Sequence, residues 1–107
     1  MATTVSRTPP GLDRPRVTVV ALRGELDAAA LDSLVETFDH AIAQDDSDVV
    51  VDLAGVEFIG AAWIGTLVRS RASLHAQDRE LTVRSPSHAV NRLLELCGLS
   101  YLIEASP

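Results

Sequence analysis

The chain has a single cysteine and no long apolar run. Because Cys97 is alone, an internal disulfide is excluded. The first ten residues contain no apolar stretch suited to a secretory signal peptide. No segment approaches the roughly 18–20 consecutive apolar residues that a membrane-spanning helix requires. We therefore expect a cytoplasmic protein with no direct membrane contact.

Positive charge is also scarce. Nine Lys and Arg residues stand against fifteen Asp and Glu residues, which gives a formal net charge of -6 and a pI near 4.8. Such a chain repels the phosphate backbone of DNA or RNA, because binding to that backbone depends on clustered Lys and Arg side chains. The composition argues against nucleic acid as a direct partner.

Aromatic residues make up only 4% of the chain, whereas hydrophobic residues make up 47%. The core must therefore consist of Val, Leu, Ile and Ala, which suits helices packed on a largely parallel sheet. A length of 107 residues provides for one domain with one core.

The hydrophobic periodicity predicts alternating strands and helices. The expected elements are an edge strand near 3–7, strands at 17–22, 49–53, 81–83 and 101–103, and helices at about 27–42, 61–75 and 88–97. We predict an α/β fold with a small mixed or parallel sheet and helices mainly on one face. Residues 1–15 are expected to form a mobile segment or short edge strand, and residues 16–105 the domain.

The apolar spacing also predicts which helix faces are buried. In the second helix the expected core face comprises Ala61, Ile64, Gly65, Val68 and Ala72. Three polar residues of that helix are expected to lie elsewhere: Thr66, Ser70 and Ser73. Cys97 continues the apolar stripe of the third helix, so we expect it in the core as a poorly reactive thiol.

The pattern of polar residues favours neither a metal site nor catalysis. The histidines fall on three different predicted helices: His40, His75 and His88. The acids at Asp45, Asp46 and Asp48 lack the ligand spacing of a calcium loop and are better explained as a solvated turn. The glycine-containing segment 55–65 has neither phosphate-loop motif and no lysine. We predict that the protein is not an enzyme and that it binds no metal and no cofactor.

One segment indicates a function. The loop ending at Gly60 leads into Ala61, Ala62 and Trp63, where a helix begins with free backbone amides and a positive dipole end. A hydroxyl in this position would act as a switch on phosphorylation, because a phosphate adds about -1.5 to -2 charges. This chain has two alanines there.

Three segments carry a resemblance to a known family. They are Arg23-Gly24-Glu25-Leu26-Asp27, the run from Val49 to Ile59, and the Ser85-Pro86-Ser87 opening with Leu93 to Leu99. In this order and spacing the chain resembles the STAS family, shared by sulfate transporters and bacterial anti-sigma factor antagonists. The resemblance runs from about Arg16 to Ile103. It implies a regulatory binding module whose partner is an ATPase-type anti-sigma factor kinase.

The family's switch loop reads D-S-S-G-L-G, and its second serine is phosphorylated by that kinase, which breaks the complex. Carried over to this chain, the aspartate becomes Gly60, the first serine Ala61, the phosphorylated serine Ala62 and the glycine Trp63. The last two positions become Ile64-Gly65. The resemblance therefore implies an antagonist that is not phosphorylated at the usual position.

The partner-binding residues expected from the resemblance and the loop are Gly24, Asp27, Gly60, Ala61, Ala62, Trp63 and Thr66. Two interpretations of Trp63 stay open: an indole presented to a partner, or one folded back to cover Phe58. Thr66 is the nearest remaining hydroxyl and a weak candidate for a replacement phosphosite.

The alternative function is that of a structural STAS subunit in a signalling complex or lipid-transport ABC system. No prediction of the oligomeric state follows from the sequence.

Overall fold

The computed structural model describes residues 2–7, 17–24, 28–44 and 46–103. Four strands form one sheet in the order β1-β2-β3-β4. They are β1 (Ala2–Arg7), β2 (Val17–Arg23), β3 (Asp48–Gly55) and β4 (Leu81–Arg84). β1 pairs antiparallel with β2, whereas β2, β3 and β4 are parallel. The predicted small mixed sheet is confirmed.

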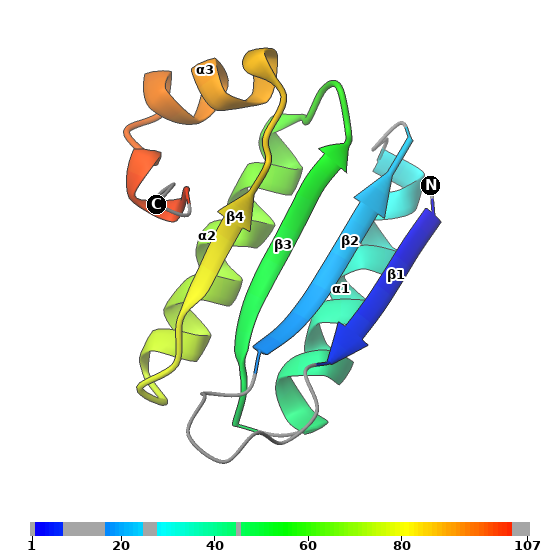
Figure 1. Ribbon diagram of the computed structural model, residues 1–107, viewed down its shortest axis with the longest axis vertical. Coiled ribbons are helices and arrows are strands. Elements are labelled where there is room, and N and C mark those ends of the chain that lie inside the picture. Colours follow the sequence, from blue (N-terminus) through cyan, green and yellow to red (C-terminus); the bar gives the residue numbers. More distant parts are fainter. Residues whose placement is uncertain (1, 8–16, 25–27, 45, 104–107) are drawn as a thin grey trace.

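Three α-helices connect or follow these strands: α1 (Ala28–Gln44), α2 (Ala61–His75) and α3 (His88–Leu96). Figure 1 shows α1 and α2 on the same face of the sheet, with α3 beside the end of β4. The helices therefore lie mainly on one face, as predicted. None of the helices in the described part of the chain is both long and apolar enough to span a membrane.

The core lies between the sheet and these two helices. In β2 the buried residues alternate with partly exposed ones, because successive side chains of a strand point to opposite faces. Leu34 and Phe38 of α1 are fully buried against this side. The buried hydroxyl of Thr18 is satisfied by Ser47 Oγ at 2.6 Å, so the one polar residue in the buried row of β2 costs little.

The buried face of α2 differs from the predicted one. The buried residues are Trp63, Ile64, Thr66, Leu67 and Leu74. Of the predicted core face only Ile64 is buried, and the two alanines are exposed. The helix carries two apolar stripes, and the stripe with the larger side chains faces the core because it removes more apolar area from water.

The end of the chain differs from the prediction at two points. Residues Ser100–Leu102 form a 3₁₀ helix (η1), and only Ile103 bridges the sheet, in parallel with Val83. The predicted last strand is thus wrong. Cys97 is exposed, against the prediction of a core thiol. α3 ends at Leu96 and Gly98 adopts a φ of 72°, so the apolar stripe stops one residue too early to bury the thiol.

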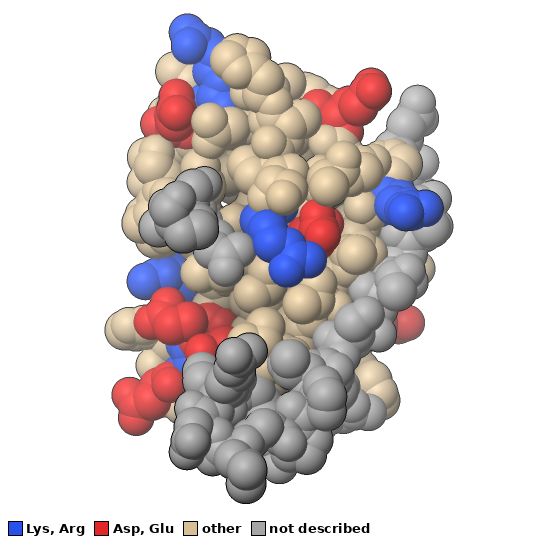
Figure 2. Space-filling model, viewed as in Figure 1, with Lys and Arg blue, Asp and Glu red and all other residues tan. Residues whose placement is uncertain are grey.

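The charged side chains show no basic patch on the face that Figure 2 displays. Among the described residues on that face, positive and negative side chains are scattered among each other.

Candidate functional site

The candidate site lies at the carboxyl ends of the parallel strands, where α2 begins (Figure 1). Gly24 follows β2 with a φ of 85°, a conformation that strains residues other than glycine. Its N–H donates to the Gly55 carbonyl at 3.1 Å, which joins the ends of β2 and β3. A Cβ at Gly55 would lie 2.8 Å from Arg23 Cγ and 3.2 Å from the Leu22 carbonyl. Gly24 is therefore required by its backbone conformation, and Gly55 by the close packing of these strand ends.

The loop between β3 and α2 is held at three points and projects one aromatic side chain. Val56 and Ile59 are buried in the core. The Glu57 carbonyl accepts a hydrogen bond from Ser87 Oγ at 3.1 Å, which ties the loop to the start of α3. Phe58 lies between these points and is 70% exposed. The loop thus presents a phenyl ring on a fixed backbone.

Helix α2 starts without a side-chain cap. Gly60 is its N-cap, and its carbonyl accepts from Trp63 N–H and Ile64 N–H at 3.1 and 3.2 Å. Ala61 and Ala62 are exposed, so the first turn offers backbone amides and methyl groups but no hydroxyl. A Cβ added at Gly60 would meet nothing within 4 Å. This opening can approach a partner closely.

Trp63 does not take part in that exposed surface. Its side chain is 2% exposed and belongs to the hydrophobic core. The interpretation in which its indole is presented to a partner is wrong. The alternative, an indole folded back from solvent, agrees with this burial, while Phe58 itself is 70% exposed. The stripe formed by Trp63, Leu67 and Leu74 is the sequence signal that identifies Trp63 as a core residue.

Thr66 is also buried, with 4% of its surface exposed. Its hydroxyl donates to the Ala62 carbonyl at 3.0 Å and accepts from Arg69 Nη2 at 3.3 Å. The prediction that Thr66 lies off the buried face is therefore wrong. The Thr66 hydroxyl is thus buried and engaged in two hydrogen bonds.

An ion pair lies close to the strand ends. Arg84 Nη2 donates to Asp52 Oδ2 at 2.9 Å, and the Ala54 N–H donates to Asp52 Oδ1 at 2.9 Å. The hydrogen bond from Arg84, and then that from Ala54, lower the pKa of Asp52 below its usual value, against a smaller opposing effect of burial. The pair links β3 to β4, with Asp52 three residues before the end of β3 and Arg84 at the end of β4.

The structure brings most of the predicted site residues to one edge of the sheet. The residues that lie there are Gly24, Gly60, Ala61 and Ala62. Trp63 and Thr66 are buried residues in the first turns of α2. Asp27 lies outside the described residues. Among the residues that the structure describes, no group of three or more His, Cys, Asp or Glu side chains can hold a metal ion. Phe58 is an exposed residue of this edge that was not among the predicted site residues.

The sheet, its helices and the loop before α2 make up a small α/β domain. The family model described as "Mlab, STAS domain" matches residues 12–104. The chain belongs to this family. It is similar to the anti-sigma-B factor antagonist of Staphylococcus aureus strain NCTC 8325, with 28% identity over 87 residues that cover 81% of each chain. The anti-sigma-B factor antagonist of Staphylococcus epidermidis matches to the same extent.

Solved structures show the same fold. The anti-sigma factor antagonist SpoIIAA in its unphosphorylated form superposes with a TM-score of 0.80 at 20% identity, covering 99% of this chain and 89% of that one. A STAS domain protein from Planctomyces limnophilus gives a TM-score of 0.75 at 23% identity, covering 92% and 86%. These similarities place the four strands and three helices in a known arrangement.

Proposed function

We propose that this protein is a non-enzymatic anti-sigma factor antagonist that binds an ATPase-type anti-sigma factor kinase and is not regulated by phosphorylation of its switch loop. The relatives named as anti-sigma-B factor antagonists support the antagonist role. Because the proposed partner acts on a sigma factor, the proposal places the protein in the cytoplasm.

The observation that carries the proposal is the chemistry of the first turn of α2. Its exposed positions are occupied by Ala61 and Ala62, whose methyl side chains have no oxygen to accept a phosphoryl group. The next hydroxyl, that of Thr66, is buried and engaged in two hydrogen bonds. A protein of this kind stays available to its partner at all times, so its abundance sets the level of antagonism.

We assign the contact surface to Phe58 together with Gly24, Gly60, Ala61 and Ala62. An exposed aromatic ring close in the chain to the small residues Gly60, Ala61 and Ala62 suits an interface hot spot, because the ring can be buried on binding and the backbone can approach closely. The loop backbone is held by the buried side chains of Val56 and Ile59 and by the hydrogen bond to the Glu57 carbonyl. Phe58 therefore loses less conformational entropy on binding.

The direct test is calorimetric titration of the protein into the ATPase-type anti-sigma factors encoded in its own genome, with ATP and magnesium present. We expect a complex that persists during incubation. Phe58→Ala should weaken it by about 2 kcal/mol, or roughly 30-fold. Leu96→Ala is the matched control, since Leu96 is equally exposed but lies at the far end of α3. Absence of any complex, or equal affinity of all three proteins, would contradict the proposal.

A gain-of-function variant tests the missing switch. We expect Gly60→Asp, Ala61→Ser and Ala62→Ser together to permit phosphorylation by a kinase that binds the parent protein. The space around Gly60 admits the new side chain, and positions 61 and 62 are exposed to solvent. Phosphate on the triple variant but not on the parent, read by mass spectrometry, is the expected result. Phosphate on Thr66 of the parent would overturn the regulatory part of the proposal.

A structural subunit of a larger signalling or lipid-transport assembly is the second candidate. The same observation favours it, because a permanent subunit also needs no phosphorylatable hydroxyl at the start of α2. Genome context and the identity of the binding partner distinguish the two candidate functions. A neighbouring permease gene and co-purification with the permease complex support the subunit role, whereas a neighbouring sigma factor or kinase gene supports the antagonist.

A further inference from the structure

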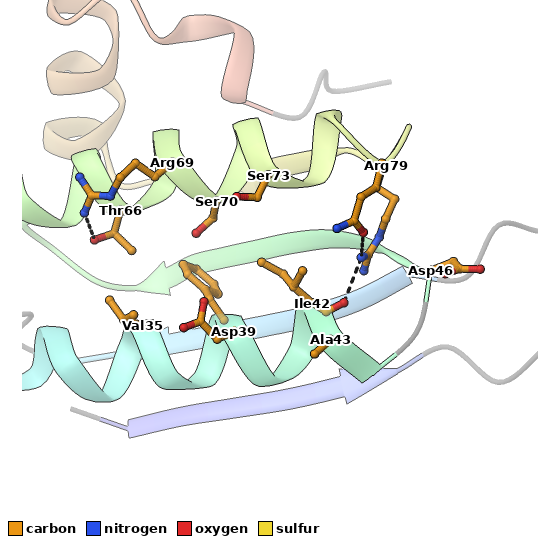
Figure 3. A pocket seen from close by; sticks show the side chains of 12 residues that line it. Val35, Asp39, Ile42, Ala43, Asp46, Thr66, Arg69, Ser70, Ser73 and Arg79 are labelled. Atoms are coloured by element: carbon orange, nitrogen blue, oxygen red, sulfur yellow. Dashed lines mark hydrogen bonds between the residues drawn. The ribbon is translucent and has the colours of Figure 1, made fainter.

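A cleft of about 640 Å³ runs between α1 and α2. Its size lies in the range of about 300–1,000 Å³ that is typical of small-molecule sites. Figure 3 shows side chains of both helices directed into the space between them. The residues that line it are Val35, Phe38, Asp39, Ile42, Ala43, Asp46, Thr66, Arg69, Ser70, Ser73, Gln77 and Arg79. The cleft runs away from Phe58, along the later turns of α2.

Arg79 forms one end of this cleft and is 4% exposed. Its Nε donates to the Ser47 carbonyl at 2.9 Å, and its Nη1 donates to the Ile42 carbonyl at 3.0 Å. Ile42 lies in the last turn of α1, where carbonyls lack helical partners, so Arg79 closes the end of that helix. These bonds account for its position but use only part of the guanidinium.

The remaining nitrogen of Arg79 has no partner. Nη2 is buried and forms no hydrogen bond. The three bonds that Arg79 does make all end on neutral oxygens, and no ion pair to Arg79 exists among the described residues. Buried arginines are normally paired with an anion, because an unpaired buried charge and an unsatisfied donor both cost free energy. Among the described residues, the buried guanidinium of Arg79 thus lacks both a counter-charge and an acceptor for Nη2.

Gln77 defines where that charge would bind. Its Oε1 accepts from Arg79 Nη1 at 2.9 Å, and the residue itself is exposed. Nη1 and Nη2 form the end of the guanidinium fork that holds a carboxylate with two parallel hydrogen bonds. A carboxylate that displaces the Gln77 amide therefore satisfies both nitrogens at once and supplies the missing counter-charge.

The rest of the cleft is lined by both apolar and polar residues, and the polar ones complement such a ligand. Asp39 from α1 and Ser70 from α2 lie on facing walls in Figure 3, and Ser73 lies one turn farther along. Their oxygens accept hydrogen bonds from hydroxyl or amino groups. We propose that the α1–α2 cleft binds a small carboxylic acid carrying hydroxyl or amino groups. Its carboxylate lies on Arg79 and its donors face Asp39, Ser70 and Ser73.

The first test is a titration of ¹⁵N-labelled protein with L-lactate, L-malate, L-glutamate and, separately, inorganic phosphate. We expect at least one of the three carboxylates to shift the Arg79 Nε–H resonance and the Ser70 amide in a saturable way. Ser70→Leu fills the cleft without removing Arg79 and should abolish these shifts. Ser33→Leu, at an exposed position of α1 outside the cleft, should keep them.

The second test supplies the carboxylate within the chain. Gln77→Glu should pair with Arg79, raise the urea midpoint and weaken carboxylate binding by about tenfold or more. Ala76→Glu adds the same charge at the neighbouring exposed position and should change neither quantity comparably. This variant tests the site without deleting Arg79, whose loss would release the end of α1.

Three results would overturn the proposal. One is saturable binding of phosphate with no response to the carboxylates, which would assign a different ligand class. Another is carboxylate binding that Ser70→Leu and Gln77→Glu leave unchanged, which would place the ligand elsewhere. The third is the absence of any saturable shift, even if Gln77→Glu is more stable, which would make Arg79 a purely structural residue.

Discussion

At the scale of single residues, two aromatic side chains five positions apart have opposite roles. Trp63 fills the core between sheet and helix, whereas Phe58 projects from the loop that leads to it. Both are apolar, so hydrophobicity alone does not distinguish them. The distinction follows from the helical spacing of Trp63 with Leu67 and Leu74, a pattern in which Phe58 has no place.

Truncation of the two rings should therefore affect different properties. Trp63→Ala leaves a large cavity in the core, and we expect it to lower the free energy of unfolding by about 3–5 kcal/mol. Phe58→Ala removes an exposed ring and should change that free energy by less than about 0.5 kcal/mol. Urea denaturation followed by circular dichroism measures both. Similar losses for the two variants would contradict the structure.

The Asp52–Arg84 ion pair predicts a specific pH dependence. The pKa of Asp52 is lowered in the folded state, chiefly by the hydrogen bond from Arg84. Its stabilisation is therefore fully present above the unfolded-state pKa of about 3.9 and is lost as the pH falls through the folded-state pKa. Asp52→Asn should cost at most about 1 kcal/mol at neutral pH, because the Arg84 side chain is 43% exposed.

Urea midpoints of Asp52→Asn and the parent should converge as the pH is lowered into the acid range. Asparagine retains an oxygen that accepts from the Ala54 N–H, so the comparison isolates the charge. Arg84→Gln should show the same pH profile, and the double variant should add little to either single change. A constant difference between parent and variant at all pH values would exclude this pair as the source.

At the scale of elements, one serine joins two parts of the candidate site. Ser87 caps α3 by accepting from the Val90 N–H at 3.2 Å, and its hydroxyl donates to the Glu57 carbonyl. The cap is a local feature that the Ser85-Pro86-Ser87 opening predicts. The bond to Glu57 spans 30 residues and follows only from the assembled sheet.

Substitution of Ser87 should show both contributions. Ser87→Ala removes both bonds, and we expect a loss of about 1 kcal/mol or somewhat more in the free energy of unfolding. Ser87→Asp keeps the capping oxygen but cannot donate to Glu57, so it should recover only part of that loss. Ser87→Thr keeps the hydroxyl, so this variant should retain nearly all of the parent's stability. Equal stability of the alanine and aspartate variants would mean that the cap is irrelevant.

The same scale shows what sequence patterns do and do not specify. The limits of α2 at Ala61 and His75 follow from its flanking loops and agree with the prediction. The buried face of α2 does not follow from spacing alone, because two apolar stripes compete and the packing of the larger side chains decides between them. The residues after Gly98 form a 3₁₀ turn, since a three-residue apolar run does not by itself distinguish a strand from a turn.

At the scale of the whole molecule, the fold separates its candidate surfaces. Phe58 and the start of α2 lie at the carboxyl edge of the parallel strands, whereas Arg79 lies beyond the opposite end of α2. The edge was predictable from the resemblance, because its loop falls at a fixed place between strand and helix. The cleft was not predictable, because Arg79 acquires its partners from residues 37 and 32 positions away.

The exposed Cys97 has a practical consequence for studying this protein. It is the only thiol in the chain and is open to solvent just after α3. Along α3 it lies about 15 Å from Ser87, the residue that touches the Phe58 loop. A maleimide dye therefore attaches to the natural sequence at one defined point, close enough to report partner docking by fluorescence anisotropy without covering the docking residues.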